Sequence, residues 1–155
     1  MDESHDIAQE PVTVRTLQQG DRDGWQSLWE AYNSFYRHVP ADEVTEATFA
    51  RLCAQSHGFF ALVAIDSTQQ PTGLAHSVLH PSTWTTASYC YLEDLYVDRR
   101  ARGTSVGRAL IESTYAEADA RGAVRVYWHT QEYNAAARSL YDQVAQRTSF
   151  VVYRR

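Results

Sequence analysis

The sequence predicts one α/β domain, with a mixed, mostly antiparallel sheet of about six strands flanked by about four helices. Three observations support this. A chain of 155 residues, of which 44% are hydrophobic and 21% charged, suits a single globular domain. Residue periodicity changes in the order strand, two helices, three strands, helix, strand, helix, strand. No internal repeat or low-complexity linker divides residues 1–155, of which residues 1–10 are expected to be flexible.

The first part of the chain supplies a strand and two helices. Apolar and polar residues alternate over residues 12–18, which predicts a strand. Residues 21–36 predict a helix that Asp21 or Asp23 can cap. Residues 41–55 predict a second helix with an inward face of Val44, Phe49 and Leu52. The apolar face of the first helix consists of Trp25, Leu28, Trp29, Tyr32 and Tyr36.

The middle of the chain predicts an antiparallel hairpin and a third strand. Residues 58–66 form a continuous apolar run of strand length, residues 67–73 are rich in turn formers, and residues 73–80 form a second strand. Residues 81–88 predict a loop, and residues 89–97 a third strand.

The last part of the chain alternates helices and strands. A helix begins at Val106 and ends at Gly122, and its apolar stripe comprises Val106, Ala109, Leu110, Ser113 and Ala116. Residues 123–130 predict a strand, residues 134–145 a helix capped by Asn134, and residues 148–155 a final strand.

Charge and composition exclude several classes of function. A net charge of −5 argues against extensive contact with nucleic acid and suits a cationic small molecule. No apolar run approaches the ~20 residues that span a bilayer, and the acidic, polar start lacks a secretory pattern, so we expect a cytoplasmic protein without a membrane partner. Cys53 and Cys90 are expected to be buried thiols. No metal site is expected.

The stretch VDRRARGTSVGRALI, residues 97–111, joins a predicted strand to a predicted helix. The first N–H groups of a helix and its dipole favour an anion. Gly103 and Gly107 let a ligand approach the backbone, and Arg102 and Arg108 add positive charge. The spacing is neither that of a P-loop nor that of a dinucleotide fingerprint. These residues are therefore compatible with a phosphate cradle or with an ordinary surface turn.

This stretch resembles the acetyl-CoA-binding motif of the GNAT superfamily of N-acetyltransferases, Gln/Arg-x-x-Gly-x-Gly/Ala before a helix. Here the motif runs from Arg102 to Gly107, and Ser105 stands where the family usually has glycine. The stretch QEYNAAARSLYDQVA is similar to a second family motif, which Asn134 and Tyr141 fit. The element order also matches the family over nearly the whole chain, from Val12 to Tyr153. The resemblance implies the GNAT fold and acetyl-CoA as cofactor.

Two branches of the superfamily are similar to this chain. The stretch YLED resembles the diamine and thialysine acetyltransferases, and this implies that Glu93 serves as a base through water. The segment from VYWHTQEYNAAARSLYDQVA to the end resembles a branch with histone and polyamine acetyltransferases. The family carries a strand bulge here, where two strands splay to admit the pantetheine arm. Glu93 or Asp94 could instead only pair with Arg99 or Arg100 on the surface.

The acid for the departing thiolate is expected to be Tyr141, because a phenol stays protonated at neutral pH. A core aromatic beside Leu140 is the alternative interpretation. The resemblance also implies two sets of binding residues. For the cofactor they are Leu95, Tyr96, Val97, Arg102, Gly103, Thr104, Ser105, Val106, Gly107, Arg108, Asn134 and Arg138. For the substrate they are Trp29, Tyr32, Trp84, Asp94 and His129.

The function expected from these residues is acetyl transfer, in a ternary complex, to a primary amine of a polyamine, lysine analogue or amino acid. A protein or histone-tail lysine acetyltransferase and a non-catalytic acyl-CoA-binding module remain as alternatives. The family usually closes its sheet with two strands after the last helix, whereas only residues 148–155 remain here. The exposed edge predicts a homodimer.

Overall fold

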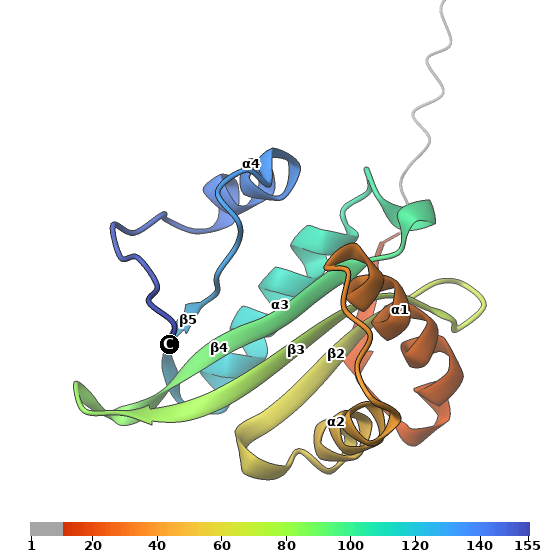
Figure 1. Cartoon of the computed structure of the whole chain (residues 1–155), viewed down its shortest axis with the longest axis horizontal. Coiled ribbons are helices and arrows are strands. Elements are labelled where there is room, and N and C mark those ends of the chain that lie inside the picture. The colour runs from red at the N-terminus through yellow and green to blue at the C-terminus, as the bar shows by residue number, and fades with distance from the viewer. Residues whose placement is uncertain (1–10) are drawn as a thin grey trace, which may run out of the picture.

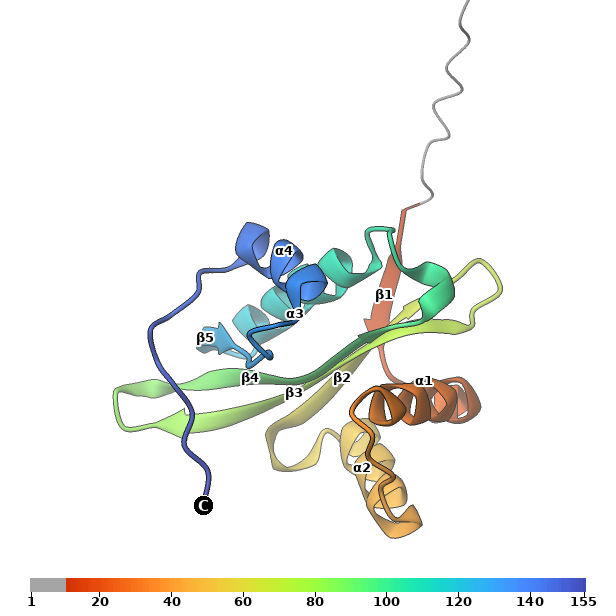
Figure 2. The ribbon, with the colours of Figure 1, turned by 45° about the horizontal axis from the view of Figure 1, so that its top comes forward.

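The computed structural model describes residues 11–155, so the flexibility expected of residues 1–10 lies outside it. A five-stranded sheet forms the middle of the described chain, with α1 and α2 on one face and α3 and α4 on the other (Figure 1 and Figure 2). Among the described residues, no helix has the length and apolar character needed to cross a membrane.

The sheet has the order β1-β2-β3-β4-β5. Its first four strands pair antiparallel, and β5 lies parallel to β4. The strands are β1 Thr13–Thr16, β2 Phe59–Ile65, β3 Pro71–Ser82, β4 Thr85–Val97 and β5 Ala123–Tyr127. The helices are α1 Arg22–Phe35, α2 Asp42–Ala54, α3 Val106–Ala120 and α4 Ala135–Val144. Short 3-10 turns occupy residues 19–21, 56–58 and 99–101. The predicted mixed, mostly antiparallel α/β fold with four helices is confirmed.

Strand β2 is apolar throughout because helices cover both of its faces. Phe60, Leu62 and Ala64 belong to the core cluster that packs against α3. The alternate residues Val63 and Ile65, on the opposite face, belong to the cluster beneath α1 and α2. A half-buried strand would instead show strict alternation of apolar and polar residues.

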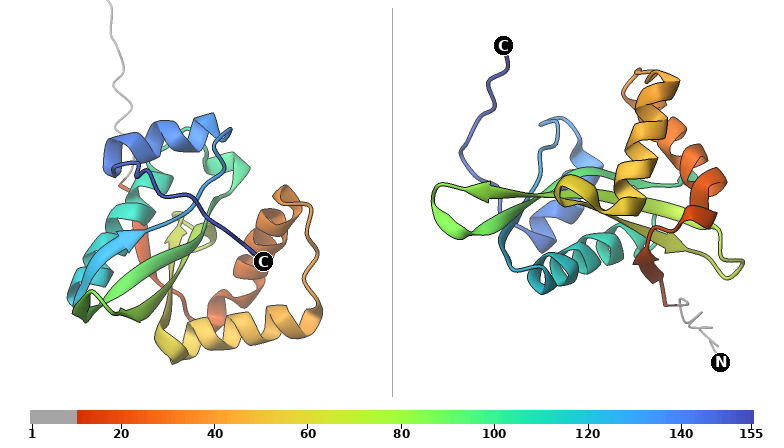
Figure 3. Two further views of the ribbon diagram at one scale, coloured as in Figure 1. Left: turned by 60° about the vertical axis from the view of Figure 1, so that its left-hand side comes forward. Right: turned by 90° about the horizontal axis from the view of Figure 1, so that it is seen from below.

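The predicted sixth strand is wrong. Residues 148–155 form no strand, and Phe150 and Tyr153 are about nine-tenths exposed. Figure 3 shows this C-terminal segment running away from the sheet. A strand needs a hydrogen-bonding neighbour, and this segment meets none within the described chain. The predicted loop at residues 81–88 is also mostly strand, because β3 and β4 extend into a long hairpin that turns at residues 83–84.

The buried faces of α2 and α3 differ in part from the predicted apolar faces. In α2, Phe49 and Leu52 are buried as predicted, but Val44 is half exposed. In α3, Ser113 and Ala116 stay outside the core, and the side chains that pack inward are Ile111, Thr114 and Ala118. Gly122, with φ +79°, follows the end of α3 as predicted.

Two further expectations concern caps and thiols. Asp21 occupies the position that begins α1, but its carboxylate accepts hydrogen bonds from Arg15 and from the backbone N–H of Gln18 instead of capping the helix.

The two cysteines match the expectation of thiols in an apolar setting. Cys90 is buried and Cys53 is partly buried, and both are free thiols. Burial raises the pKa of each thiol, which makes both poor nucleophiles near neutral pH.

Candidate active site

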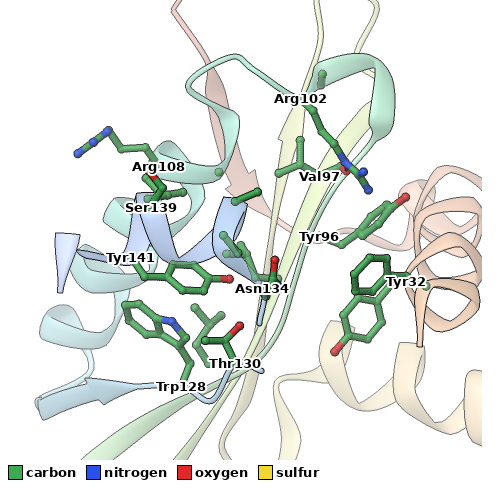
Figure 4. Close-up of a pocket in the computed structure, with 18 of the residues that line it drawn as sticks. Tyr32, Tyr96, Val97, Arg102, Arg108, Trp128, Thr130, Asn134, Ser139 and Tyr141 are labelled. Carbon is green, nitrogen blue, oxygen red and sulfur yellow. Dashed lines mark hydrogen bonds between the residues drawn. The ribbon is translucent and has the colours of Figure 1, made fainter. Parts of the chain in front are cut away.

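A splay between β4 and β5 opens a large cavity among the described residues. Strand β5 pairs with β4 only from Ser88 to Tyr91, while β4 continues to Val97. The cavity that opens beyond this point has a volume of about 700 Å³. Its walls come from the end of α1, from β4, from the turn before α3 and from residues 128–143 (Figure 4). An unpaired stretch of β4 backbone therefore faces a cavity, where an extended ligand could pair with it.

Most of the predicted site residues line this one cavity. They are Tyr32, Glu93, Leu95, Tyr96, Val97, Arg102, Gly103, Thr104, Ser105, Gly107, Arg108, His129, Asn134 and Tyr141. Five predicted residues do not: Trp29, Trp84, Asp94, Val106 and Arg138.

Two tryptophans predicted for the substrate site lie elsewhere. Trp29 is buried in the core beneath the sheet, stacked on Trp25, and its indole N–H donates to Thr45 Oγ1 over 3.1 Å. Trp84 lies at the tip of the β3–β4 hairpin, where 88% of it is exposed. The helical spacing of Trp29 reflects core packing, and the position of Trp84 reflects the length of the hairpin.

Two residues predicted for the cofactor site are also engaged elsewhere. Val106 is 6% exposed and packs in the core, because the first turn of α3 points it toward the sheet. The guanidinium of Arg138 donates to the backbone carbonyl of Glu132 over 2.6 Å, on the loop before α4.

The turn between β4 and α3 exposes backbone donors. Gly103 has φ +73°, a left-handed conformation that glycine adopts without strain. The first regular helical hydrogen bond of α3 joins Ala109 N–H to the carbonyl of Ser105. Within the described chain, the N–H groups of Gly107 and Arg108 form no hydrogen bond, as expected for the first turn of a helix. This turn fits the diphosphate of a nucleotide cofactor.

Ser105 occupies its unusual position without strain. Its φ of −85° lies in the ordinary region for an L-residue, and its side chain is exposed. Gly107 is more constrained, because a Cβ there would lie 3.2 Å from Cδ2 of Leu140 on α4. A side chain at Gly107 would therefore be tight against α4, unless Leu140 shifts by a few tenths of an ångström.

The two arginines beside the turn contact protein groups. Arg102 donates from Nε to the carbonyl of Val97 over 3.2 Å, and its guanidinium lies 5.5 Å from the ring centroid of Tyr96. Arg108 donates to Gln143 on α4 and points away from the cavity (Figure 4). A ligand that pairs with the Val97 carbonyl would share that oxygen with Arg102 or displace it.

Tyr141 reaches the cavity from α4. Its ring meets that of Trp128 edge to face, with centroids 5.3 Å apart, and its hydroxyl points toward Asn134 (Figure 4). Burial, and to a smaller extent Tyr36, raises the pKa of the phenol. The hydroxyl therefore keeps its proton at neutral pH and can donate it. Asn134 precedes α4 but its side chain makes no cap hydrogen bond, in contrast to the prediction, and lies at the cavity instead.

Glu93 is the extra residue of a bulge in β4. His76 on β3 pairs with Asp94, and the next residue, Ser77, pairs with Leu92, so Glu93 has no partner across the strands. Burial raises the pKa of the Glu93 carboxyl, and the negative charge of Asp94 raises it further, while His76 acts in the opposite direction. A carboxylate with a raised pKa is a better proton acceptor near neutral pH.

Asp94 lies behind the cavity wall. Its carboxylate is bonded to Nδ1 of His76 over 2.9 Å and its side chain is 14% exposed. Neither Glu93 nor Asp94 forms an ion pair with an arginine of residues 11–155, and Arg100 pairs with Asp98 instead. The surface-pair interpretation of the two carboxylates is therefore wrong.

Several residues that line the cavity were not predicted as site residues from the sequence. Tyr36 was assigned to the apolar face of α1 and lines the cavity at the end of that helix, while Trp128, Leu140 and Gln143 approach it from the other side. The alternation in residues 123–130 marks Trp128 as facing opposite to Tyr127 and His129, which could have indicated its packing under Tyr141. His129 accepts or donates a hydrogen bond with the hydroxyl of Tyr91 over 3.2 Å.

Comparison with known proteins places this geometry in context. Residues 25–145 match the model of the acetyltransferase (GNAT) family. A D-amino-acid N-acetyltransferase of Saccharomyces cerevisiae is 36% identical over 155 residues, which cover 99% of this chain and 96% of that protein. A thialysine N-epsilon-acetyltransferase of Caenorhabditis elegans is 32% identical over 57% of this chain and 52% of that protein. The solved structure of AAC(6')-Iy with a CoA-S-monomethyl-acetylneamine bisubstrate analogue superposes with a TM-score of 0.80, at 15% identity, over 94% of this chain and 97% of that chain.

Proposed function

This chain belongs to the acetyltransferase (GNAT) family, and on that premise we propose that it transfers the acetyl group of acetyl-CoA to the primary amine of a small cationic substrate, a lysine analogue, polyamine or amino acid. One observation carries the proposal. A single cavity is lined by the backbone turn at Gly107, by the carboxylate of Glu93 and by the hydroxyl of Tyr141. Anion binding, proton acceptance and proton donation are thus available side by side.

Cofactor binding would rest mainly on the backbone. The unbonded N–H groups of Gly107 and Arg108 are suited to the diphosphate, and the unpaired edge of β4 from Leu95 to Val97 is suited to the amides of the pantetheine arm. Bound acetyl-CoA supplies an activated thioester as the acetyl donor. Asn134, whose side chain is free of the helix cap, is available to the same arm.

Glu93 would accept the proton that an alkyl ammonium must lose before the amine can attack a thioester. Its place on the bulge turns it toward the cavity, and its raised pKa favours proton acceptance, directly or through a water molecule. Tyr141, with its phenol kept protonated by burial, would donate a proton or a hydrogen bond to the departing sulfur.

The acceptor side of the cavity suits a cation of modest size. Tyr32, Tyr36 and Tyr96 present aromatic rings there, and aromatic faces next to a carboxylate attract ammonium groups. The named activities of the relatives, on D-amino acids and on thialysine, support a small amino-acid-like acceptor.

A thiol-release assay tests this proposal. Acetyl-CoA would be supplied with D- and L-amino acids, thialysine, spermidine and a lysine-containing histone-tail peptide. We expect release with at least one small amine and none with the peptide. Release with the peptide alone would replace the proposal by a protein acetyltransferase, and binding of acetyl-CoA without release on any acceptor would contradict it.

We also propose a homodimer. Within the described chain, β5 has β4 as its partner on one side and nothing on the other, and Val124 on β5 is 61% exposed. A groove of about 510 Å³ runs along this edge, between β5, the end of α3 and the end of α4. The apolar residues Phe150 to Tyr153 are exposed in an extended segment that could fill such an edge on a second copy.

Light scattering separates the two oligomeric states. We expect the full chain to run as a dimer at micromolar concentration and a chain truncated after Arg147 to run as a monomer. A monomeric full chain would contradict the dimer without bearing on acetyl transfer.

A further inference from the structure

A buried chain of hydrogen bonds lies beneath the cavity and joins α1, β3 and β4. The indole N–H of Trp25 donates to Nε2 of His76 over 2.9 Å, and Nδ1 of His76 lies 2.9 Å from a carboxylate oxygen of Asp94. Trp25 is fully buried and His76 is 2% exposed. An indole nitrogen can only donate, so Nε2 of His76 must accept. The ring proton of His76 therefore sits on Nδ1 and is donated to Asp94.

This hydrogen bond spans the strand pair that borders the bulge. His76 and Asp94 are directly opposite each other, and the register shifts immediately after them. Glu93 is the residue that the shift leaves without a partner. A side-chain bond between His76 and Asp94 thus fixes the β4 backbone at the point from which Glu93 reaches the cavity.

The same bond fixes the position of a negative charge. Burial is the largest cause of the raised pKa of Glu93, and also of the raised pKa values of Tyr32 on α1 and of Tyr36 just after α1. The negative charge of Asp94 raises all three further. His80 is hydrogen bonded to the hydroxyl of Tyr127, and His129 to that of Tyr91. The titratable groups that face Glu93 are Asp94 and Tyr91 on β4, His76 on β3, Tyr32 on α1 and Tyr127 on β5.

We propose that His76 is a positioning residue for proton acceptance by Glu93: by holding the carboxylate of Asp94 against β3, it fixes both the bulge and the negative neighbour of Glu93. His76 is buried and does not line the cavity, and its role runs through Asp94. The proposal rests on the proposed function, in which Glu93 accepts the proton of the amine.

Two amide variants of His76 test the roles of its two ring nitrogens separately. In H76N the amide nitrogen stands near the position of Nδ1 and can still donate to Asp94. In H76Q the longer amide reaches the position of Nε2 and can still accept from Trp25, but the donor to Asp94 is lost. Without that donor, the carboxylate of Asp94 is no longer held against β3. Glu93 then has a negative neighbour whose position is not fixed.

The readout is the acidic limb of the pH profile of kcat/KM. A negative neighbour raises the pKa of a carboxyl, so its loss moves the limb to lower pH. We expect D94N and H76Q to move the midpoint to lower pH, and H76N to keep the wild-type midpoint. The double variant D94N/H76Q should match D94N alone, because both changes remove one interaction.

A merely structural role would lower activity or thermal stability in every His76 variant without moving the midpoint, and that result would overturn the proposal. Additive midpoint shifts in the double variant would overturn it as well. Should H76Q fail to fold, an unchanged midpoint in D94N would still overturn it, because Asp94 is the group through which His76 acts.

The variant E93Q keeps the two proposals distinguishable. If E93Q leaves activity and its pH profile unchanged, the proposed role of Glu93 fails and this inference falls with it. If E93Q removes the acidic limb while H76Q and D94N leave the wild-type limb in place, only the role of His76 fails.

Discussion

Tyr141 on α4 and Trp128 after β5 meet edge to face, with their ring planes 69° apart. This contact sets the direction in which the phenol hydroxyl leaves the helix, toward the cavity and Asn134 (Figure 4). The aromatic pair packs against the protein core, and the hydroxyl is available at the cavity.

The packing and the chemistry of Tyr141 can be separated by one substitution. Tyr141→Phe keeps the ring and its contact with Trp128 but removes the proton donor. We expect kcat to fall on the order of 100-fold, with little change in the affinity for acetyl-CoA or in thermal stability. Steady-state kinetics and calorimetry measure both quantities. An unchanged kcat would remove Tyr141 from the mechanism.

Glu93 should give the enzyme its acidic limb. Its folded pKa lies above the ordinary value of 4.5, so the proton-accepting form, and the activity with it, is lost as the pH falls through that raised pKa. We expect Glu93→Gln to lower kcat/KM on the order of 100-fold or more and to flatten the limb. Glu112→Gln, on the exposed face of α3, is the matched control and should leave the profile unchanged.

The turn before α3 should tolerate a change at Ser105 but not at Gly107. Ser105→Gly, which installs the residue usual in the family, should change acetyl-CoA affinity less than about threefold, because Ser105 has an ordinary φ and is exposed. Gly107→Val places a branched side chain against Leu140 and should weaken binding by roughly tenfold, or about 1.4 kcal/mol. Isothermal titration calorimetry measures both, and similar losses in the two variants would contradict this assignment.

Gly58 should be essential for stability. It has φ +83°, and a Cβ there would lie 2.4 Å from the backbone oxygen of Leu79. Gly58→Ala should lower the free energy of unfolding by about 2–4 kcal/mol. Gly20→Ala is the control, because an added Cβ there meets nothing within 4 Å, and its effect should stay within about 0.5 kcal/mol. Urea unfolding that ranks the two alike would refute the steric argument.

The pair of Arg15 and Asp21 should make stability depend on pH. The hydrogen bond from Arg15 holds the pKa of Asp21 below its ordinary 3.8, with burial acting the other way. The stabilising contribution is therefore complete above the unfolded pKa near 3.8 and is lost as the pH falls through the lower folded pKa. Asp21→Asn should cost about 1–3 kcal/mol at pH 7.

As the pH falls through the lowered pKa of Asp21, the difference between wild type and Asp21→Asn should shrink, because the wild-type carboxyl then becomes protonated too. Urea denaturation of both proteins across this range measures it. A difference that stays constant from neutral to acid pH would mean that the ion pair contributes nothing specific.

Elements with a clear internal pattern were predictable from sequence. The apolar run of β2 and the glycine that ends α3 each carry their information locally, in residue type and spacing. The predictions that failed depended on partners. Val44 and Ser113 have the right spacing for a core, but the surfaces opposite them decided otherwise.

By itself the sequence determined the mixed α/β fold, because backbone preference and apolar periodicity are properties of neighbouring residues. It also marked the turn from Arg102 to Gly107 as the candidate cofactor site, through the resemblance of this turn to the family motif. Only the tertiary structure decided that Glu93 and Tyr141 share a cavity, that Asp94 is held by His76, and that residues 148–155 form no strand. Periodicity tells which face of an element is apolar. Which distant side chain meets that face, or whether any strand meets an edge, depends on contacts that local spacing does not encode.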